Sequence, residues 1–198
     1  MTILNRAAKW PAHSRIGVML ALVFMAAISL KPVDSVASEP AARRGGVLSL
    51  QDRAEIQDLI SSYAIYIDFN EPKAWASLFA VDGEFLIPEA DLHLKGHDQL
   101  LAWASAAFKD RENRREITNH FVGATLLVKM SDGSVHARCK CLDAREEIPP
   151  GKSAERVPVA ICAYNDVFVK TPKGWRFASR EGGTEIPLSA EFLPEDSK

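Results

Sequence analysis

The sequence predicts a single α+β domain in which helices come first and a sheet follows. Before residue 110, apolar side chains recur at the three- and four-residue spacing of amphipathic helices. From residue 117 onward, apolar and polar residues alternate in long runs separated by turn sequences. This order is typical of domains in which helices lie on one side of an antiparallel sheet. The chain of 198 residues is long enough to bury a core without metals or disulfides.

The first and clearest helix is predicted over residues 52–68. Ser49 precedes it as a helix cap, with Asp52 as its acidic partner three positions later. One apolar stripe follows the helical period through Ile56, Leu59, Ile60, Tyr63, Ala64 and Ile67. Such a stripe predicts a helix with one face in the core.

Two further helices are expected before the sheet. Pro72 suits the first position of a short helix. Its apolar residues are Trp75, Leu78 and Phe79. The third helix is predicted over about residues 98–109, where Leu100, Leu101, Trp103, Ala104 and Phe108 recur at helical spacing.

The strands are predicted from alternation and turn sequences. A short strand over residues 84–87 is followed by a polar connection that contains His93 and His97. Four long strands are then expected over residues 117–130, 134–145, 157–170 and 175–181. Asp132 and Gly133 separate the first two of these and predict a tight hairpin.

Residues 1–37 have the composition of a secretory signal. Basic residues without acids precede an apolar run over residues 16–30. That run is shorter than the roughly 20 residues of a membrane span, and Ser35 and Ala37 supply the small residues that signal peptidase requires. We therefore expect a cleaved signal peptide, a periplasmic or secreted protein, and no stable membrane span after processing. An uncleaved N-terminal anchor is the alternative.

The remaining chain divides into a flexible leader (38–47), one folded domain (48–186) and a C-terminal tail (187–198). The whole sequence has a net charge of −2, and the signal segment carries more bases than acids, so the rest is more acidic. Charges of both signs are interspersed rather than blocked. This balance argues against nucleic acid as a partner, because nucleic-acid binding favours concentrated basic patches.

The three cysteines are Cys139, Cys141 and Cys162. Export would take all of them into an oxidising compartment. A hairpin between the strands of Cys141 and Cys162 could place these two opposite each other and permit a disulfide. Buried thiols that pack as small apolar groups are the interpretation we favour. No histidine stands at ligand spacing from the cysteines, so we expect no metal site.

Asp68 and His120 are polar residues at positions where the pattern is apolar. Asp68 ends the stripe of the first helix, and a carboxylate there is costly to bury unless it is hydrogen-bonded. His120 shares strand parity with Val122 and Val128, on the more apolar face of its strand. If a curved sheet wraps the helices, the two side chains can meet in one cavity. The sequence has no phosphate-binding glycine loop and no nucleophile elbow, so we expect chemistry without a cofactor.

Five segments, taken in their order and spacing, carry a family resemblance. They are residues 53–68, residues 76–84 (ASLFAVDGE), residues 118–121 (TNHF), Tyr164 with Asp166, and residues 174–180 (GWRFASR). Together they resemble the SnoaL-like branch of the nuclear-transport-factor-2-like superfamily, over about residues 48–183. The resemblance implies a cone-shaped α+β barrel, with three N-terminal helices packed on a curved antiparallel sheet.

The resemblance also implies a reaction class, that of a lyase or isomerase. In SnoaL-like dehydratases and dehydrochlorinases, an acid at the matching helix end pairs with a strand histidine that acts as a base. By this resemblance His120 would remove a proton from carbon, and Asp68 would fix its tautomer and stabilise its protonated form. Tyr63 or Tyr66 would present a hydroxyl to the ligand; the alternative is that both pack as aromatic core with a solvated hydroxyl. The alternative is a non-catalytic ligand-binding or dimerisation module of the same fold.

The expected ligand is a small apolar molecule in the cavity of the cone. Trp75 would line that cavity or seal the contact between helices. Arg145 would face His120 across the hairpin if the strands paired without a bulge, and could then bind a carboxylate or enolate oxygen. A salt bridge at the rim is the default interpretation for Arg145. Apolar residues on both faces of the strands predict a homodimer through the sheet.

Overall fold

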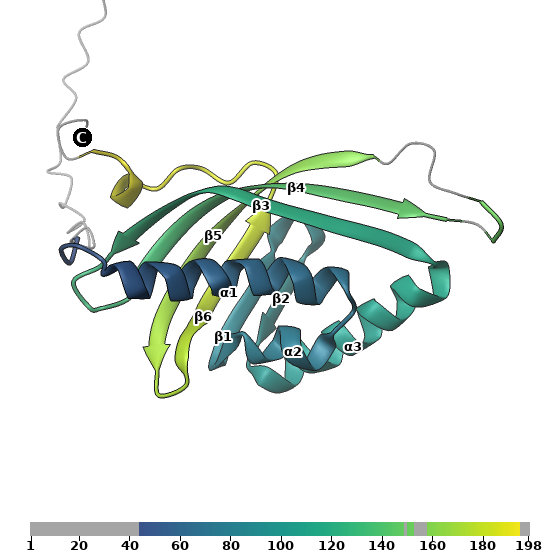
Figure 1. The fold of residues 1–198 in the computed structure, drawn as a ribbon, viewed down its shortest axis with the longest axis horizontal. Helices are drawn as coiled ribbons and strands as arrows, with labels where there is room; N and C mark the ends of the chain where they lie inside the picture. The colour runs from purple at the N-terminus through teal and green to yellow at the C-terminus, as the bar shows by residue number, and fades with distance from the viewer. Residues whose placement is uncertain (1–43, 149, 153–157, 195–198) are drawn as a thin grey trace, which may run out of the picture. The chain divides into compact units, whose positions relative to one another are not determined.

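The computed structural model describes residues 44–148, 150–152 and 158–194. The predicted signal segment 1–37, most of the predicted leader and the last residues of the tail lie outside the described residues. The elements are α1 (Leu50–Asp68), α2 (Pro72–Ser77), β1 (Phe79–Ile87), the 3₁₀ turn η1 (Pro88–Ala90), β2 (Leu92–Lys95), α3 (His97–Arg114), β3 (Glu116–Lys129), β4 (Val135–Glu147), β5 (Val159–Thr171), β6 (Gly174–Gly183) and the 3₁₀ turn η2 (Ala190–Phe192) (Figure 1). This order confirms the α+β prediction.

The six strands form one sheet in the order β2-β1-β6-β5-β4-β3. Neighbouring strands are antiparallel except β1 and β6, which are parallel. The prediction of a purely antiparallel sheet is therefore wrong at this pair. Strands β1 and β6 are neighbours in the sheet but far apart in the sequence. Their relative direction therefore depends on the long stretch of chain between them, because no local turn connects them.

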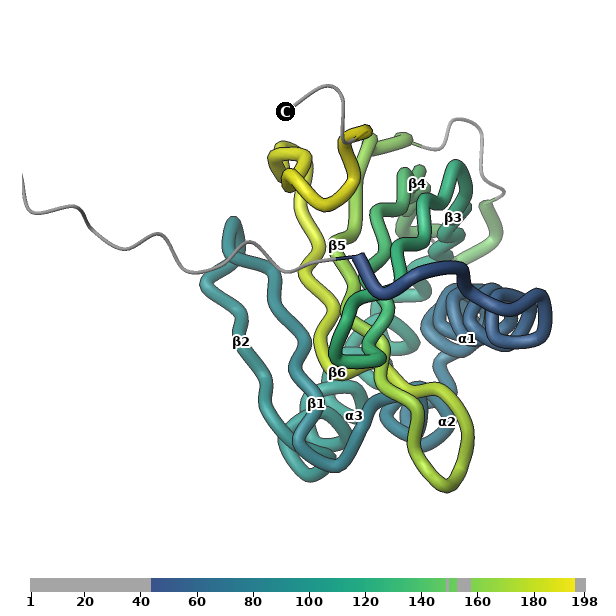
Figure 2. The backbone as a smooth tube through the Cα atoms, turned by 90° about the vertical axis from the view of Figure 1, so that its left-hand side faces the viewer, coloured from purple at the N-terminus to yellow at the C-terminus, as the bar shows by residue number. Residues whose placement is uncertain are grey.

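Helices α1, α2 and α3 cover one face of the curved sheet, and Figure 2 shows the same arrangement from the side. Ser49 caps α1, since its hydroxyl accepts a hydrogen bond from the Asp52 amide at 3.0 Å and donates one to the Asp52 carboxylate at 2.7 Å. The apolar stripe of α1 is buried as predicted. The end of this helix is therefore held against the sheet, which fixes where Asp68 lies.

Aromatic side chains fill the space between the helices and β1. Trp75 is fully buried at their centre. Its ring packs within 6.1 Å, between centroids, of Tyr63, Phe79, Phe85, Trp103 and Phe108. Offset and edge-on contacts of this kind stabilise a core beyond the area that they bury. Trp75 thus has the sealing role that the sequence allowed for it.

Some boundaries differ from those predicted. Strand β1 starts at Phe79, which was expected in the second helix, because Leu78 already ends α2. The expected polar connection around His93 is the strand β2, which pairs with β1. Helix α3 continues to Arg114, past the predicted end at residue 109, and thereby brings Arg111 into a buried position.

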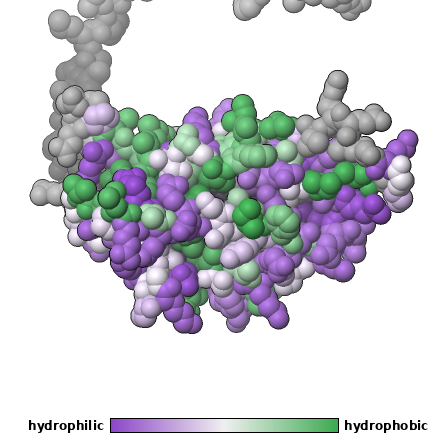
Figure 3. Space-filling model, viewed as in Figure 1, coloured by the Kyte–Doolittle hydropathy of each residue, from purple (hydrophilic) through white to green (hydrophobic). Residues whose placement is uncertain are grey.

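On the face shown in Figure 3, hydrophobic patches alternate with hydrophilic ones. Within the part of the chain that the structure describes, no helix has both the length and the apolar character needed to cross a membrane.

Candidate functional site

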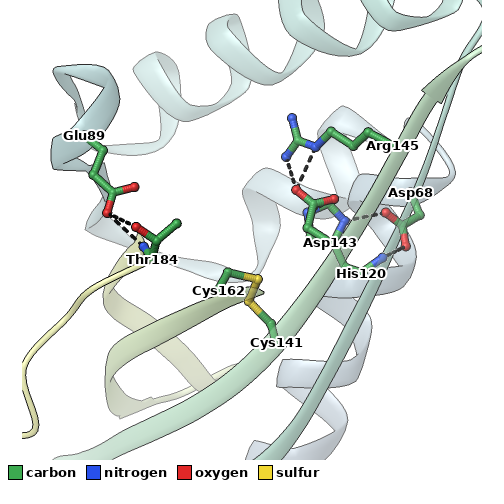
Figure 4. The surroundings of a disulfide bond; sticks show 8 residues. All are labelled: Asp68, Glu89, His120, Cys141, Asp143, Arg145, Cys162 and Thr184. Atoms are coloured by element: carbon green, nitrogen blue, oxygen red, sulfur yellow. Dashed lines mark hydrogen bonds and ion pairs between the residues drawn. A yellow bond between two sulfur atoms is a disulfide. The ribbon is translucent and has the colours of Figure 1, made fainter. Parts of the chain in front are cut away.

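The side chains of Asp68 and His120 meet where the end of α1 crosses β3. The His120 Nδ1 atom lies 2.6 Å from Asp68 Oδ1, and the His120 backbone amide donates to Asp68 Oδ2 at 2.7 Å (Figure 4). Only 3% of the His120 side chain and 12% of the Asp68 side chain are exposed. The expected contact is thus present. Since Nδ1 faces the carboxylate, Nε2 is the nitrogen left to face the cavity.

Two residues that the sequence did not single out hold Asp68 in place. Thr118 donates from its hydroxyl to Asp68 Oδ1 at 3.1 Å, and Arg111 donates from Nη1 to the Thr118 oxygen at 3.1 Å. Arg111 also donates from Nη2 to the carbonyl of Ile67 at 2.8 Å. Burial lowers the pKa of Arg111, with a smaller contribution from the charge of Arg145. Thr118 shares strand parity with His120, which is the signal that could have found it.

Asp143 is the second carboxylate beside the histidine. It pairs with His120 across the ladder of β3 and β4, and its Oδ1 atom lies 3.7 Å from His120 Nε2. Its Oδ2 atom accepts from Arg145 Nε at 2.7 Å and lies 2.6 Å from Arg145 Nη2. Arg145 itself pairs with Thr118 in the register. Arg145 therefore does not face His120, and the default interpretation, a salt bridge, is what the structure contains.

A bulge explains the changed register. The pairing of β3 with β4 shifts between Gly123 and Leu126, and Ala124 there has a positive φ of 44°. A second shift arises at the turn, where Lys129 pairs with Val135. Two one-residue shifts keep the same face of β4 toward His120, but they replace residue 145 by residue 143.

A cavity of about 340 Å³ opens beside this cluster. Its polar wall contains His120, Asp143 and Arg145. Apolar side chains on the wall include Ile67, Phe85, Ile87, Leu92 and Trp103. Figure 4 shows His120 with its acidic neighbours on one side and Glu89 with Thr184 on the other. Thr184 donates to Glu89 from its amide and its hydroxyl, at 2.8 Å each. Size and lining suit a small, largely apolar molecule with a few polar groups.

Tyr63 lines this cavity, whereas Tyr66 and Trp75 are not among the residues that line it. Tyr164, which belongs to one of the segments that carry the family resemblance, also lines it. Burial raises the pKa of both Tyr63 and Tyr164, so their hydroxyls stay protonated and can donate hydrogen bonds. Of the four predicted ligand-binding residues, the structure therefore brings Tyr63 and Arg145 to the cavity.

The guanidinium of Arg180 packs against the rings of Tyr63 and Tyr164. Its guanidinium carbon lies 4.0 Å from the centre of the Tyr63 ring and 4.2 Å from that of Tyr164. Arg180 forms a fully buried ion pair with Asp166, through two hydrogen bonds of 2.8 Å. Burial opposes its charge, but Asp166 keeps the pKa of Arg180 above the ordinary value. This pair gives Asp166 a structural role in the sheet.

Cys141 and Cys162 form a disulfide across β4 and β5, where they are direct neighbours in the register. The interpretation that we favoured, buried thiols, is therefore wrong for these two and applies to Cys139 alone. Cys139 is a free, buried thiol, and burial raises its pKa to about 12. Cys162 lines the cavity, so the disulfide fixes the strand that carries Asp143 to its neighbour close to the candidate site (Figure 4).

The fold and the cavity define a class, the cone-shaped α+β domains of the nuclear-transport-factor-2-like type. Residues 48–181 match the family described as the SnoaL-like domain, and the chain belongs to that family. Among curated proteins, no sequence matches this chain.

Solved structures support the same fold. ActVI-ORFA from Streptomyces coelicolor is 20% identical, with a TM-score of 0.60 over 71% of this chain and 100% of its own. An NTF2-like protein with a cystatin-like fold from Novosphingobium aromaticivorans is 24% identical, with a TM-score of 0.58 over 72% of this chain and 87% of its own. LinA is 24% identical, with a TM-score of 0.56 over 73% of this chain and 95% of its own. At these identities the likeness concerns the fold alone.

Proposed function

We propose that this protein is a cofactor-independent lyase or isomerase, in which His120 removes a proton from a carbon atom of a small, largely apolar molecule. The observation that carries the proposal is the hydrogen bond from His120 Nδ1 to Asp68, which leaves Nε2 to face a cavity of about 340 Å³. The resemblance to SnoaL-like dehydratases points to the same pair of residues.

The geometry suits a neutral imidazole that acts as a general base. The Nδ1–H group donates a hydrogen bond to Asp68, so the lone pair of Nε2 is free to accept a proton. Asp68 holds the ring in this tautomer and stabilises the imidazolium that forms, as the buried acid does in a hydrolase triad. A carbon next to a carbonyl or a leaving group is acidic enough for such a base.

Deuterium exchange tests proton abstraction without knowledge of the natural substrate. The wild-type chain is incubated in D₂O with compact ketones such as 1-indanone and 1-tetralone, and exchange at the carbon next to the carbonyl is followed by ¹H NMR. We expect exchange above background, and a loss of about 10²–10⁴-fold in His120→Ala, the usual contribution of a general base. Asp68→Asn should lose at least about 10²-fold, because it favours the wrong tautomer.

His93→Ala is the matched control, since the His93 side chain is 57% exposed and its partner is Glu84, away from the cavity. Circular dichroism checks that each variant is folded. Unchanged exchange in His120→Ala would exclude the mechanism. Ligand binding by the wild type without any exchange would favour the alternative, a ligand-binding module.

The proposal includes export of the protein. The composition of residues 1–37 motivates it, and the disulfide between Cys141 and Cys162 supports it, because disulfides persist in oxidising compartments. Expression of the full chain in a bacterium should give a periplasmic or secreted product whose intact mass begins at Ser38. A cytoplasmic product of full mass would contradict export.

The proposal also includes a homodimer that forms through the outer face of the sheet. Phe121, Leu142 and Ile161 are neighbours across β3, β4 and β5. Their exposed fractions are 65%, 44% and 69%. A contiguous apolar row of this kind marks an interaction surface, and a second copy of the chain presents the same row.

A further inference from the structure

One oxygen of Asp143 stands out among the polar atoms that face the cavity. Asp143 Oδ2 is occupied by the Arg145 guanidinium, with Nε at 2.7 Å. Asp143 Oδ1 is buried and accepts no hydrogen bond from any residue that the structure describes. A buried acceptor without a donor costs free energy, so a ligand that supplies a donor gains affinity there.

The position of this oxygen defines where such a donor would lie. Asp143 Oδ1 is 3.7 Å from His120 Nε2, which is too long for a direct hydrogen bond. A hydroxyl that donates to Asp143 Oδ1 therefore leaves room for a neighbouring atom of the same molecule beside His120 Nε2. Both residues line the same cavity, so the donor would be part of the molecule bound there.

The charges around this point select a neutral group. Asp68 and Asp143 place two carboxylates beside the imidazole of His120. Arg145 is already paired with Asp143, so it does not offer an unbalanced positive charge to an anion. A carboxylate or phosphate on the ligand would therefore be repelled, whereas a neutral hydroxyl would donate to Asp143 Oδ1.

We propose that Asp143 is a specificity-determining residue. It selects molecules with a neutral hydroxyl group next to the atom that approaches His120 Nε2. The role of His120 as a base in this statement rests on the proposed function; the recognition of the hydroxyl by Asp143 does not. Arg145 holds the Asp143 carboxylate in place through Oδ2, which leaves Oδ1 to accept from the ligand.

Binding of three matched aromatic molecules tests the selection: 2-naphthol, its methyl ether 2-methoxynaphthalene, and naphthalene. At neutral pH 2-naphthol is uncharged, and it has no proton on saturated carbon to lose, so binding is measured apart from turnover. Calorimetry or competition with a fluorescent ligand should show that the wild type prefers 2-naphthol to its methyl ether by about tenfold or more, as expected for a hydrogen bond to a charged acceptor.

Asp143→Leu should reduce this preference to less than about threefold while naphthalene still binds. Asp143→Asn keeps an acceptor without the charge and should give an intermediate preference, so the test holds even if the leucine variant does not fold. His120→Ala is the control for the base and should keep most of the preference.

An unchanged preference in both Asp143 variants would overturn the proposal, and so would a wild type that binds 2-naphthol no better than its methyl ether or does not bind it at all. Failure of the exchange experiment with an intact 2-naphthol preference would remove the base and leave the role of Asp143. The two proposals can therefore fail separately.

Discussion

Asp68 is a carboxylate at the end of an apolar helical stripe, and its neighbours explain how it can be there. It accepts hydrogen bonds from the Thr118 hydroxyl, the His120 amide and the His120 ring. The guanidinium of Arg111 adds a positive charge one step further away, through Thr118. Each donor lowers the cost of burying the charged form of Asp68, so the acid can serve as a fixed partner of the histidine.

Thr118→Val tests this support at the scale of one residue. Valine keeps the shape of the buried threonine but removes the hydroxyl that joins Arg111 to Asp68. We expect the free energy of unfolding in urea to fall by about 1–3 kcal/mol, because a buried donor and a buried acceptor each lose a partner. Exchange activity should fall as well, since Asp68 is less well held.

Thr125→Val is the matched control on the same strand, because the Thr125 hydroxyl donates to the weak acceptor sulfur of Cys139, at 3.5 Å. Equal losses of stability in the two variants would show that the hydroxyl of Thr118 has no special role.

Asp68 and His120 could be predicted from the sequence, because each is a polar residue at a position that the apolar pattern places in the protein interior. Asp143 could not be predicted in this way. It stands between the apolar residues Leu142 and Ala144, so alternation alone does not mark it as part of a site. Its place beside His120 depends on two register shifts, one at the bulge of β3 and one at the turn. Arg111 was missed for a different reason, since it lies beyond the predicted end of its helix.

At the scale of elements, local signals gave most of the helices and hairpins, and long-range pairings were the part that failed. The cap at Ser49 and the turn at Asp132 and Gly133 act over a few residues, so the sequence displays them directly. The parallel contact of β1 with β6 joins segments from opposite ends of the domain. No turn motif encodes such a pairing, which follows from how the sheet closes around the helices.

Ala124→Gly tests the bulge that sets the register of β3. Ala124 has a φ of 44°, where the Cβ atom of an L-residue is strained and glycine is not. We expect glycine to raise the free energy of unfolding by up to about 1 kcal/mol, measured by urea denaturation. The gain should come without a change in the 2-naphthol preference, because the register stays the same.

Ala160→Gly is the control, an exposed alanine of β5 that does not have a positive φ. There glycine should lower the stability by about 0.5–1 kcal/mol, through the entropy of the unfolded chain. A loss of stability in Ala124→Gly that matches this control would mean that the bulge is not strained.

At the scale of the whole molecule, the two faces of the curved sheet carry residues of different kinds. The inner face of β3 and β4 carries His120 and Asp143 toward the cavity, and the outer face carries the apolar row that begins with Phe121. Alternation along a strand allows both, because neighbouring residues point to opposite sides. Phe121 and Leu142 do not line the cavity, whereas Ile161 does, so a partner on this row would lie next to the cavity wall.

Phe121→Lys tests the dimer that this division of faces suggests. Phe121 is 65% exposed and lies beside Leu142 in the register, so a lysine would place a charge inside the proposed interface. We expect light scattering after size-exclusion chromatography to give the mass of two chains for the wild type and of one chain for Phe121→Lys. Phe69→Lys is the matched control, because Phe69 is 72% exposed but lies at the C-cap of α1 and not on a strand of the proposed interface, and this variant should stay dimeric. A monomeric wild type, or a Phe121→Lys variant that remains dimeric, would contradict the use of this face.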